Sequence, residues 1–477
     1  MKSIKKNYIY NLFYQILTMA APLITTPYVS RVLGAEPIGE YSYAYSIMYY
    51  FMLAAILGTA TYAEREISFY QDDRKKRSQR FWDLVVLRAI TTLISVSCYA
   101  IIVKFLFVDY IMFGIISLNI ISVALDTVWL FQGLEEFGQI TLRDSIIKVL
   151  TIILILLFVN SPNDLYVYVL IMSLSPVISA ISLFPFIHRY IDRPFGENLH
   201  PFKDFKNIIG LFIPAVAISA YAMLDKTMLG IFTVEKAENG YYEQAIKLSK
   251  TALTIVTALG TVMIPRISYY AEKKETKKIE EYMLKSYRFV WLLGIPICFG
   301  LIGISNNLVP WFYGEQFEKV KELLKILSFL VIAIGLSNVT GMQYLIPTKQ
   351  QKELTNSVLI GAVINVVLNV MLIPRFYALG AAIASVCAEF MVTIVQLFYI
   401  QKQISVRKIL LPLFRYATAG IIMLAALSLE DTIFPPNALC TSVMIFSGGS
   451  IYFLVLLLIK DTFVRDIFVK PMKQKKK

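Results

Sequence analysis

The sequence has little charge and few residues that could hold a metal. Only 17% of its 477 residues are Asp, Glu, Lys or Arg, whereas a soluble globular protein carries about 25%. It has two histidines and four cysteines, and the cysteines lie in apolar runs without a CxxC pair. These absences exclude a zinc site and a disulfide framework, and we expect no metal and no cofactor.

Long polar loops are scarce on one side of the chain. The segments VDY, NSPND and EDTIFPPN are too short to form a separate domain. A membrane glycosyltransferase or glycan polymerase usually needs an acidic motif on a long outer loop. The one acidic pair in a long loop, Asp72–Asp73, lies among basic residues in a loop of the opposite set. We therefore expect a protein that is not an enzyme.

Long apolar runs make up most of the chain, which is 57% hydrophobic. With their flanks they number about fourteen, each of roughly 20 residues, the length that crosses a bilayer as a helix. The runs lack the alternation of a membrane barrel, and a helix satisfies its own backbone in lipid. The sequence thus predicts an all-α membrane protein with about fourteen transmembrane helices.

Basic residues are concentrated in alternate loops. The net charge is +13, and many of the 46 Lys and Arg residues lie in segments such as MKSIKK, QDDRKKRSQR, AEKKETKKIEE and the KQKKK tail. In a fourteen-helix topology these segments fall on one side, as the positive-inside rule requires of cytoplasmic loops. We therefore expect both termini in the cytoplasm, with the lipid bilayer rather than nucleic acid as the partner of the basic runs.

Two stretches of the chain repeat each other in order. The first contains GEYSYA, LGT and REISFY, and the second contains GYYEQA, LGT and PRISYY. About six helices separate the copies, and because six is even, both copies enter the membrane from the same side. We expect two parallel six-helix lobes, residues 1–200 and 201–405, followed by two C-terminal helices and a basic tail in residues 406–477, with the substrate path between the lobes.

Several motifs resemble one known group of transporters. They are TTPYVSRVLGAEPIGEYSYA, WLFQGLEEF, DKTMLG, GYYEQA and NVVLNVMLIPRFYALGAAIASVCAEF. Together they are similar to the polysaccharide exporter branch of the multidrug/oligosaccharidyl-lipid/polysaccharide exporter superfamily, which includes Wzx-type flippases. The resemblance implies a V-shaped, MATE-like bundle in the bacterial cytoplasmic membrane. It also implies transport of undecaprenyl-diphosphate-linked oligosaccharides for O-antigen or capsule, with polymerase and glycosyltransferases of the same pathway as partners.

Ionisable residues inside apolar helices are costly and usually face a cavity. Cations there would offset the desolvation of a lipid diphosphate. The predicted substrate-binding residues are Arg31, Arg88, Arg143, Lys148, Asp225, Lys226, Lys247 and Lys250. Snorkelling of a side chain to the lipid headgroups is the alternative for Arg31 and Lys226, which lie near helix ends.

Local ion pairs are the alternative for other candidates. Asp144 and Lys148 are spaced i, i+4, and so are Glu243 and Lys247, which fits ordinary ion pairs on one helix. Arg143 and Lys250 are then left without an obvious local partner.

Acidic and aromatic residues inside the helices have two interpretations each. Glu389 and Asp126 are candidates for coupling to H⁺ or Na⁺, but a neutral, hydrogen-bonded carboxyl explains Glu389 equally well. Five tyrosines of the second helix do not share one helical face. Some could stack on sugars, and more are expected at the membrane interface. These are Tyr41, Tyr43, Tyr45, Tyr49 and Tyr50.

The leading hypothesis is a lipid-linked oligosaccharide flippase working by alternating access. A multidrug or organic-cation antiporter of the same fold is the alternative, but such a cavity should carry carboxylates, and this chain offers mainly Lys and Arg. A glycan polymerase or glycosyltransferase is the third hypothesis.

The charge asymmetry predicts the location of both termini. Single cysteines at Ser3 and Lys475 should react with a membrane-impermeant maleimide only after the cells are opened, because both termini are expected in the cytoplasm. A cysteine in the NSPND loop, for example at Asn163, is the control that should react in intact cells. Labelling of either terminus from outside would contradict the topology.

Overall fold

The computed structural model describes residues 4–193 and 199–468, and every regular element in these ranges is helical. Both ends of the chain, for which a cytoplasmic location is predicted, lie outside the described residues. The described chain divides into two compact units. The first extends to Gly230 and includes Glu235–Gly240, and the second contains Ile231–Val234 and the residues from Tyr241 onward.

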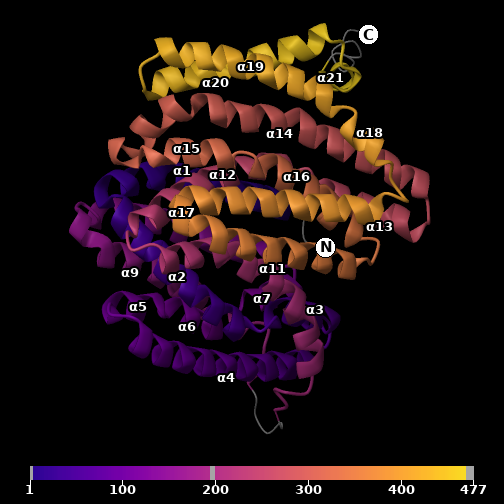
Figure 1. The fold of residues 1–477 in the computed structure, drawn as a ribbon. Helices are drawn as coiled ribbons and strands as arrows, with labels where there is room; N and C mark the ends of the chain where they lie inside the picture. Colours follow the sequence, from indigo (N-terminus) through magenta and orange to yellow (C-terminus); the bar gives the residue numbers. More distant parts are fainter. Residues whose placement is uncertain (1–3, 194–198, 469–477) are drawn as a thin grey trace. The chain divides into compact units, whose positions relative to one another are not determined.

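The first unit is built from helices that are interrupted at several points. α2 ends where Leu57 and Gly58 take left-handed backbone angles, with φ of 46° and 72°. The fourth apolar run breaks twice, into α5, α6 and α7, and α4 packs beside α5 and α6 (Figure 1). The helices are α1 (Ile4–Leu33), α2 (Ala35–Ile56), α3 (Thr59–Phe69), α4 (Arg74–Leu106), α5 (Tyr110–Ile116), α6 (Leu118–Leu125), α7 (Val128–Gly133), α8 (Phe137–Phe158), η1 (Pro162–Asp164), α9 (Leu165–Ile181), α10 (Phe184–Ile187) and α11 (Phe205–Phe232).

The second unit contains α12 from Tyr241 onward and the helices that follow it. α14, α19 and α20 pack side by side (Figure 1). The long helix α17 is two helices joined at Tyr377, whose φ of 51° and ψ of −129° are not helical. The helices are α12 (Ala237–Thr257), α13 (Gly260–Glu272), α14 (Thr276–Tyr313), η2 (Glu315–Phe317), α15 (Lys319–Leu327), α16 (Leu330–Thr340), η3 (Gly341–Leu345), α17 (Gln351–Ile400), α18 (Val406–Leu410), α19 (Leu413–Ile433), α20 (Ala438–Leu458) and α21 (Thr462–Phe468).

Many of these helices are long and apolar enough to cross a membrane. Within the described ranges nine helical stretches meet this criterion, or ten if the bent pair Ala237–Thr257 and Val262–Glu272 forms one span. The prediction of an all-α, multi-pass membrane protein is confirmed at this level. Fourteen spans in two parallel lobes stay a prediction.

The order of elements repeats between the two halves of the chain. α2 breaks into α3 at Leu57–Gly58, and α12 breaks into α13 at Ala258–Leu259. A long uninterrupted helix follows in each half, α4 and then α14. After it comes a broken helix, α5–α7 in the first half and α15–η3 in the second. This order agrees with the sequence repeat, although superposition of the halves stays a prediction.

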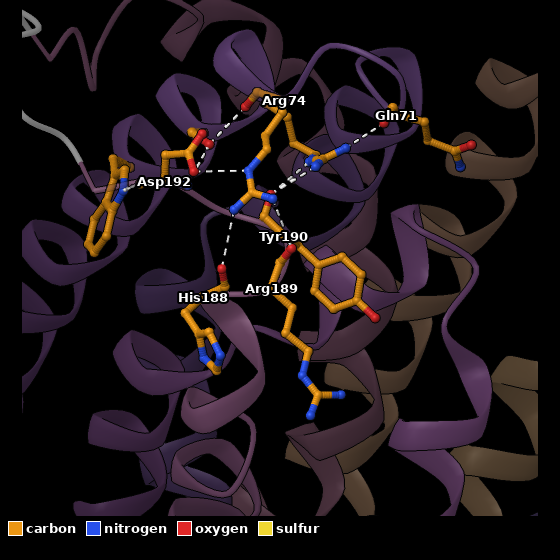
Figure 2. Close-up of polar contacts among 9 residues, drawn as sticks. Gln71, Arg74, His188, Arg189, Tyr190 and Asp192 are labelled. Carbon is orange, nitrogen blue, oxygen red and sulfur yellow. Dashed lines mark hydrogen bonds and ion pairs between the residues drawn. The ribbon is translucent and has the colours of Figure 1, made fainter.

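An ion pair and hydrogen bonds connect the first residues of α4 to the segment that follows α10. Figure 2 shows the Arg74 side chain reaching Asp192, and its Nε lies 2.9 Å from Asp192 Oδ1. The same guanidinium donates to the carbonyl oxygen of His188 at 3.3 Å. One turn along α4, Arg77 donates through Nη2 to the carbonyl oxygen of Tyr190 at 2.8 Å. These contacts provide hydrogen-bond donors to backbone carbonyl groups that have no partner within a helix.

An apolar core lies at the same end of the first unit. Tyr190 packs against it and donates its hydroxyl to Glu136 at 2.7 Å. Burial, reinforced by this carboxylate, raises the pKa of the Tyr190 phenol, which keeps it a neutral donor. The buried members of the core are Tyr62, Ala63, Ile67, Phe81, Leu84, Leu87, Trp129, Leu130, Phe131, Ile140, Leu183, Ile191 and Ile208.

The two glycines that match in the sequence repeat lie against each other's helices within the first unit. A Cβ on Gly39 would lie 1.7 Å from the carbonyl oxygen of Lys236, and one on Gly240 would lie 2.0 Å from the carbonyl oxygen of Ala35. Only a residue without a side chain permits this approach between the first turns of α2 and α12.

Alanine at either glycine should therefore destabilise the protein. We expect Gly39→Ala and Gly240→Ala each to cost about 1–3 kcal/mol, because backbone must move to relieve the overlap. Thermal unfolding of the detergent-solubilised protein measures this as a lowered melting temperature. Gly114→Ala on α5 is the control, since its added Cβ meets nothing within 4 Å. Equal melting temperatures for all three variants would contradict the close approach.

Candidate functional site

α8 carries a polar stripe on one face and apolar side chains on the other. Asp144, Lys148 and Thr151 are spaced i, i+4, i+7, so they share one face of the helix. None of the three is fully exposed. The exposed large apolar residues of α8 are Phe137, Leu142, Ile146, Val149, Leu150, Ile153, Leu154, Leu156, Leu157 and Phe158. The polar stripe therefore faces protein rather than lipid.

A cavity of about 370 Å³ lies against this stripe. α8 contributes Arg143, Asp144 and Lys148 to its wall, and α9 contributes Ser175 and Ser179. The cavity lies wholly within the first unit. It brings together two of the predicted cations with one carboxylate, so its wall has one positive charge in excess. A partly enclosed, positively charged wall between membrane helices can bind an anionic group.

The carboxylate of Asp144 pairs with Arg143. Arg143 Nη2 lies 2.6 Å from Asp144 Oδ1, and Arg143 Nη1 donates to the carbonyl oxygen of Ser179 at 2.9 Å. The Ser179 hydroxyl donates to the same Asp144 oxygen at 3.0 Å. The interpretation of Arg143 as a cation without a local partner was therefore wrong. The long Arg143 side chain connects α8 to α9 through its guanidinium group. The spacing of residues along α8 alone does not show this contact.

Lys148 is held differently from Arg143. Its Nζ donates to Thr18 Oγ1 of α1 at 3.3 Å, and its side chain is partly buried in the cavity wall. The i, i+4 pairing of Asp144 with Lys148 stays a prediction. A lysine in a cavity wall can also form a charge-assisted hydrogen bond to an anionic group.

Arg88 and Asp126 form a second cluster, at the break between α6 and α7. Only 2% of the Arg88 side chain is exposed. Its Nη1 donates to the carbonyl oxygen of Asp126 at 2.9 Å, and Nη2 lies 3.2 Å from Asp126 Oδ2. Asp126 Oδ1 accepts from the Val128 amide at 3.0 Å. The two residues predicted separately, for substrate binding and for ion coupling, thus pair with each other and with the backbone at the break.

The remaining candidates of the first unit lie on α1 and α11. Arg31 is exposed in the last turn of α1, and it forms no hydrogen bond or ion pair with the described residues. On α11, Asp225 is buried and Lys226 is half-buried. The carbonyl oxygen of Lys226 accepts from Asn239 Nδ2 at 2.7 Å.

The candidates of the second unit lie on α12 and α17. Lys247 is half-buried on α12, while Lys250 is exposed. Glu389 is half-buried on α17, and its carbonyl oxygen accepts from the Thr393 hydroxyl at 3.1 Å. In the part of the chain that the structure describes, three or more His, Cys, Asp or Glu residues nowhere gather in a group that could hold a metal ion.

Sequence reasoning missed the α9 side of the cavity. Ser175, Pro176 and Ser179 line it, yet their neutral side chains do not stand out in an apolar run. A usable signal was present on α8, where polar residues recur with helical spacing opposite an apolar face.

Comparisons with solved structures show the fold. The chain superposes on the lipid II flippase MurJ in its inward closed conformation with a TM-score of 0.71, at 16% identity, over 97% of this chain and 99% of that one. It also matches an inward-facing MATE family multidrug resistance transporter of the MOP superfamily with a TM-score of 0.62, at 13% identity, over 85% and 95% of the two chains. The protein has a MATE-like membrane transporter fold.

Sequence comparisons agree with this fold. A putative O-antigen transporter of Escherichia coli K12 is 24% identical over 84% of this chain and 97% of its own length. A probable low-salt glycan biosynthesis flippase of Haloferax volcanii, Agl15, is 25% identical over 48% and 49% of the two chains. The family model described as polysaccharide biosynthesis protein matches residues 4–271, more than half of the chain. The chain therefore belongs to the polysaccharide biosynthesis protein family, whose members of this kind are membrane transporters and flippases rather than enzymes.

Proposed function

We propose that this protein is a flippase for undecaprenyl-diphosphate-linked oligosaccharides. It would move them across the bacterial cytoplasmic membrane by alternating access, for the assembly of O-antigen or capsule. The observation that carries this proposal is the cavity between α8 and α9, whose wall holds Arg143 and Lys148 against Asp144. The names of the relatives in Escherichia coli and Haloferax volcanii support the same substrate class.

The charge of the cavity distinguishes between the transport hypotheses. A lipid diphosphate must bring negative charge into a region of low dielectric constant, and the excess cation offsets part of that desolvation cost. An organic cation would meet repulsion from the same wall. The cavity therefore favours an anionic lipid over the cation that an antiporter of this fold would carry.

Fourteen spans are proposed from the bounds of the helices. Nine stretches meet the length and hydropathy criterion, and α17 among them is two helices joined at Tyr377. Four more helices have at least 21 residues each, namely α1, α8, α11 and α12. Each is long enough to cross about 30 Å of hydrocarbon. This count supports two six-helix lobes, residues 1–200 and 201–405, with two further helices after them and both termini in the cytoplasm.

The remaining cations and acids have proposed roles on the transport path. We assign diphosphate contacts to Arg31 and Lys226, and further contacts with the moving lipid to Lys247 and Lys250. Asp126 pairs with Arg88, and Glu389 is the other candidate for coupling to H⁺ or Na⁺. A polymerase and glycosyltransferases of the same pathway are the proposed partners, because they would consume and supply the lipid-linked glycan.

Neutralising Lys148 should reduce transport without unfolding the protein. We expect Lys148→Gln to lower the rate of flipping roughly tenfold, because a charge-assisted contact to the diphosphate is lost. Lys148→Arg should keep most of the rate. The assay is flipping of undecaprenyl-diphosphate-linked oligosaccharide in proteoliposomes. Lys104→Gln, which removes an exposed cation in the last turn of α4, is the matched control and should behave like wild type.

Arg31 and Lys226 provide an independent test of the proposed path. Arg31→Ala should abolish glycan export at normal membrane levels of protein, while Arg31→Lys should retain part of it, because charge matters more than shape to a moving ligand. Surface glycan is measured in cells that lack their own copy of the gene. Snorkelling to headgroups predicts near-normal export. Full export by Arg31→Ala and Lys226→Ala, singly and combined, would exclude both residues from the path.

A further inference from the structure

Three tyrosines of α2 form a row on one helical face. Tyr41, Tyr45 and Tyr49 are spaced i, i+4, i+8, and consecutive ring centroids lie 5.8 and 6.2 Å apart. Tyr168 of α9 meets Tyr41 edge-on, with centroids 5.4 Å apart. The five tyrosines considered in the sequence thus divide into this row and a second group, which contains Tyr43 and Tyr50 and packs elsewhere.

The second group has a packing role on the opposite face of α2. The Tyr43 ring fills the space beside Gly230, where an added Cβ would lie 2.0 Å from ring carbon Cδ2. The Tyr50 hydroxyl lies 3.1 Å from the Thr227 hydroxyl of α11. These two tyrosines are explained by contacts between helices.

Interfacial anchoring does not explain the row. At about 1.5 Å per residue, Tyr41 lies roughly 9 Å and Tyr49 roughly 21 Å along the helix from its first residue, Ala35. Interfacial tyrosines stay at the level of the headgroups, and the hydrocarbon region is about 30 Å thick. Tyr45, roughly 15 Å along the helix, would therefore lie near the middle of the membrane, too deep for an anchor.

The row does not face lipid either. Helices of the first unit that border lipid expose large apolar side chains, such as Leu93 of α4, Ile153 of α8 and Ile178 of α9. α2, which the structure describes throughout, exposes none of its large apolar side chains. The three rings are half-buried. Their open parts consequently face the interior of the protein.

The row continues into the cation-lined cavity along one face of α9. Tyr168, Met172, Ser175 and Ser179 are spaced i, i+4, i+7, i+11 and share that face. Tyr168 contacts the row, and the other three line the cavity. A ligand with an anionic group at one end and several rings at the other fits this succession of surfaces.

Tyrosine rings suit a saccharide as the ring-bearing part. Each phenol ring presents an apolar face and a polar hydroxyl tip, and a pyranose ring presents an apolar C–H face and hydroxyl edges. A pure hydrocarbon chain would not need the hydroxyls. We propose that Tyr41, Tyr45 and Tyr49 form a row on which the sugar rings of the glycan stack while its diphosphate occupies the neighbouring cavity, with the buried Tyr168 packed behind Tyr41. This proposal rests on the proposed flippase function.

A binding experiment with two lipid probes tests the row. The full-length protein in nanodiscs is titrated with undecaprenyl diphosphate and with undecaprenyl diphosphate carrying an oligosaccharide of neutral hexoses. The double variant Tyr45→Leu, Tyr49→Leu should bind the glycan-bearing probe roughly tenfold more weakly, because two stacking contacts are lost. Its affinity for the sugar-free probe should not change. The double variant Tyr45→Phe, Tyr49→Phe keeps the rings and should retain most of the affinity for glycan.

The controls separate this proposal from the function on which it rests. Tyr43→Leu makes the same substitution on the opposite face of α2 and should leave the preference for the glycan-bearing probe unchanged. If wild type binds both probes and the leucine double variant weakens both equally or neither, the stacking row is wrong and the flippase function stands. If wild type binds neither probe, the proposed function itself is wrong.

Discussion

The ion pair between Arg88 and Asp126 is the interaction on which the first unit depends. A helix that breaks within a membrane leaves carbonyl and amide groups without partners, and lipid offers none. Here the carbonyl oxygen of Asp126 accepts from Arg88 and from Trp129 Nε1, while its carboxylate accepts from the Val128 amide. The break can therefore persist, and it lets α7 turn against α3 in the apolar core.

The same constraint explains why charge is tolerated on α8. A cation among membrane helices needs a counter-charge, a hydrogen-bond acceptor or water. Arg143 has the first two, in Asp144 and the carbonyl oxygen of Ser179. Lys148 has the Thr18 hydroxyl and a cavity wall. The hydrogen bonds of Arg143 join α8 to α9, and Lys148 lies in the wall of the same cavity.

The class of fold could be predicted from the sequence, but the contacts between side chains within it could not. Apolar runs predict helices because lipid leaves the backbone few alternatives, and the matched motifs agree with the order of helices in both halves. The partner of Arg143 was missed because neighbours in sequence do not normally face each other on a helix, and here the pair is completed by Ser179 of α9. The row of Tyr41, Tyr45 and Tyr49 was missed because two other tyrosines obscured its period.

Different polar groups lie at the broken helix of each half of the chain. In the first half a buried arginine and Asp126 stabilise the break. In the second half the corresponding run passes through a π-helix, Gly341–Leu345, where Gln343 Nε2 lies 3.5 Å from Asn338 Oδ1. This run thus has neutral amides near its irregular turn, where the first half has a buried ion pair at its break. A buried ion pair is more sensitive to nearby charge than a pair of neutral amides.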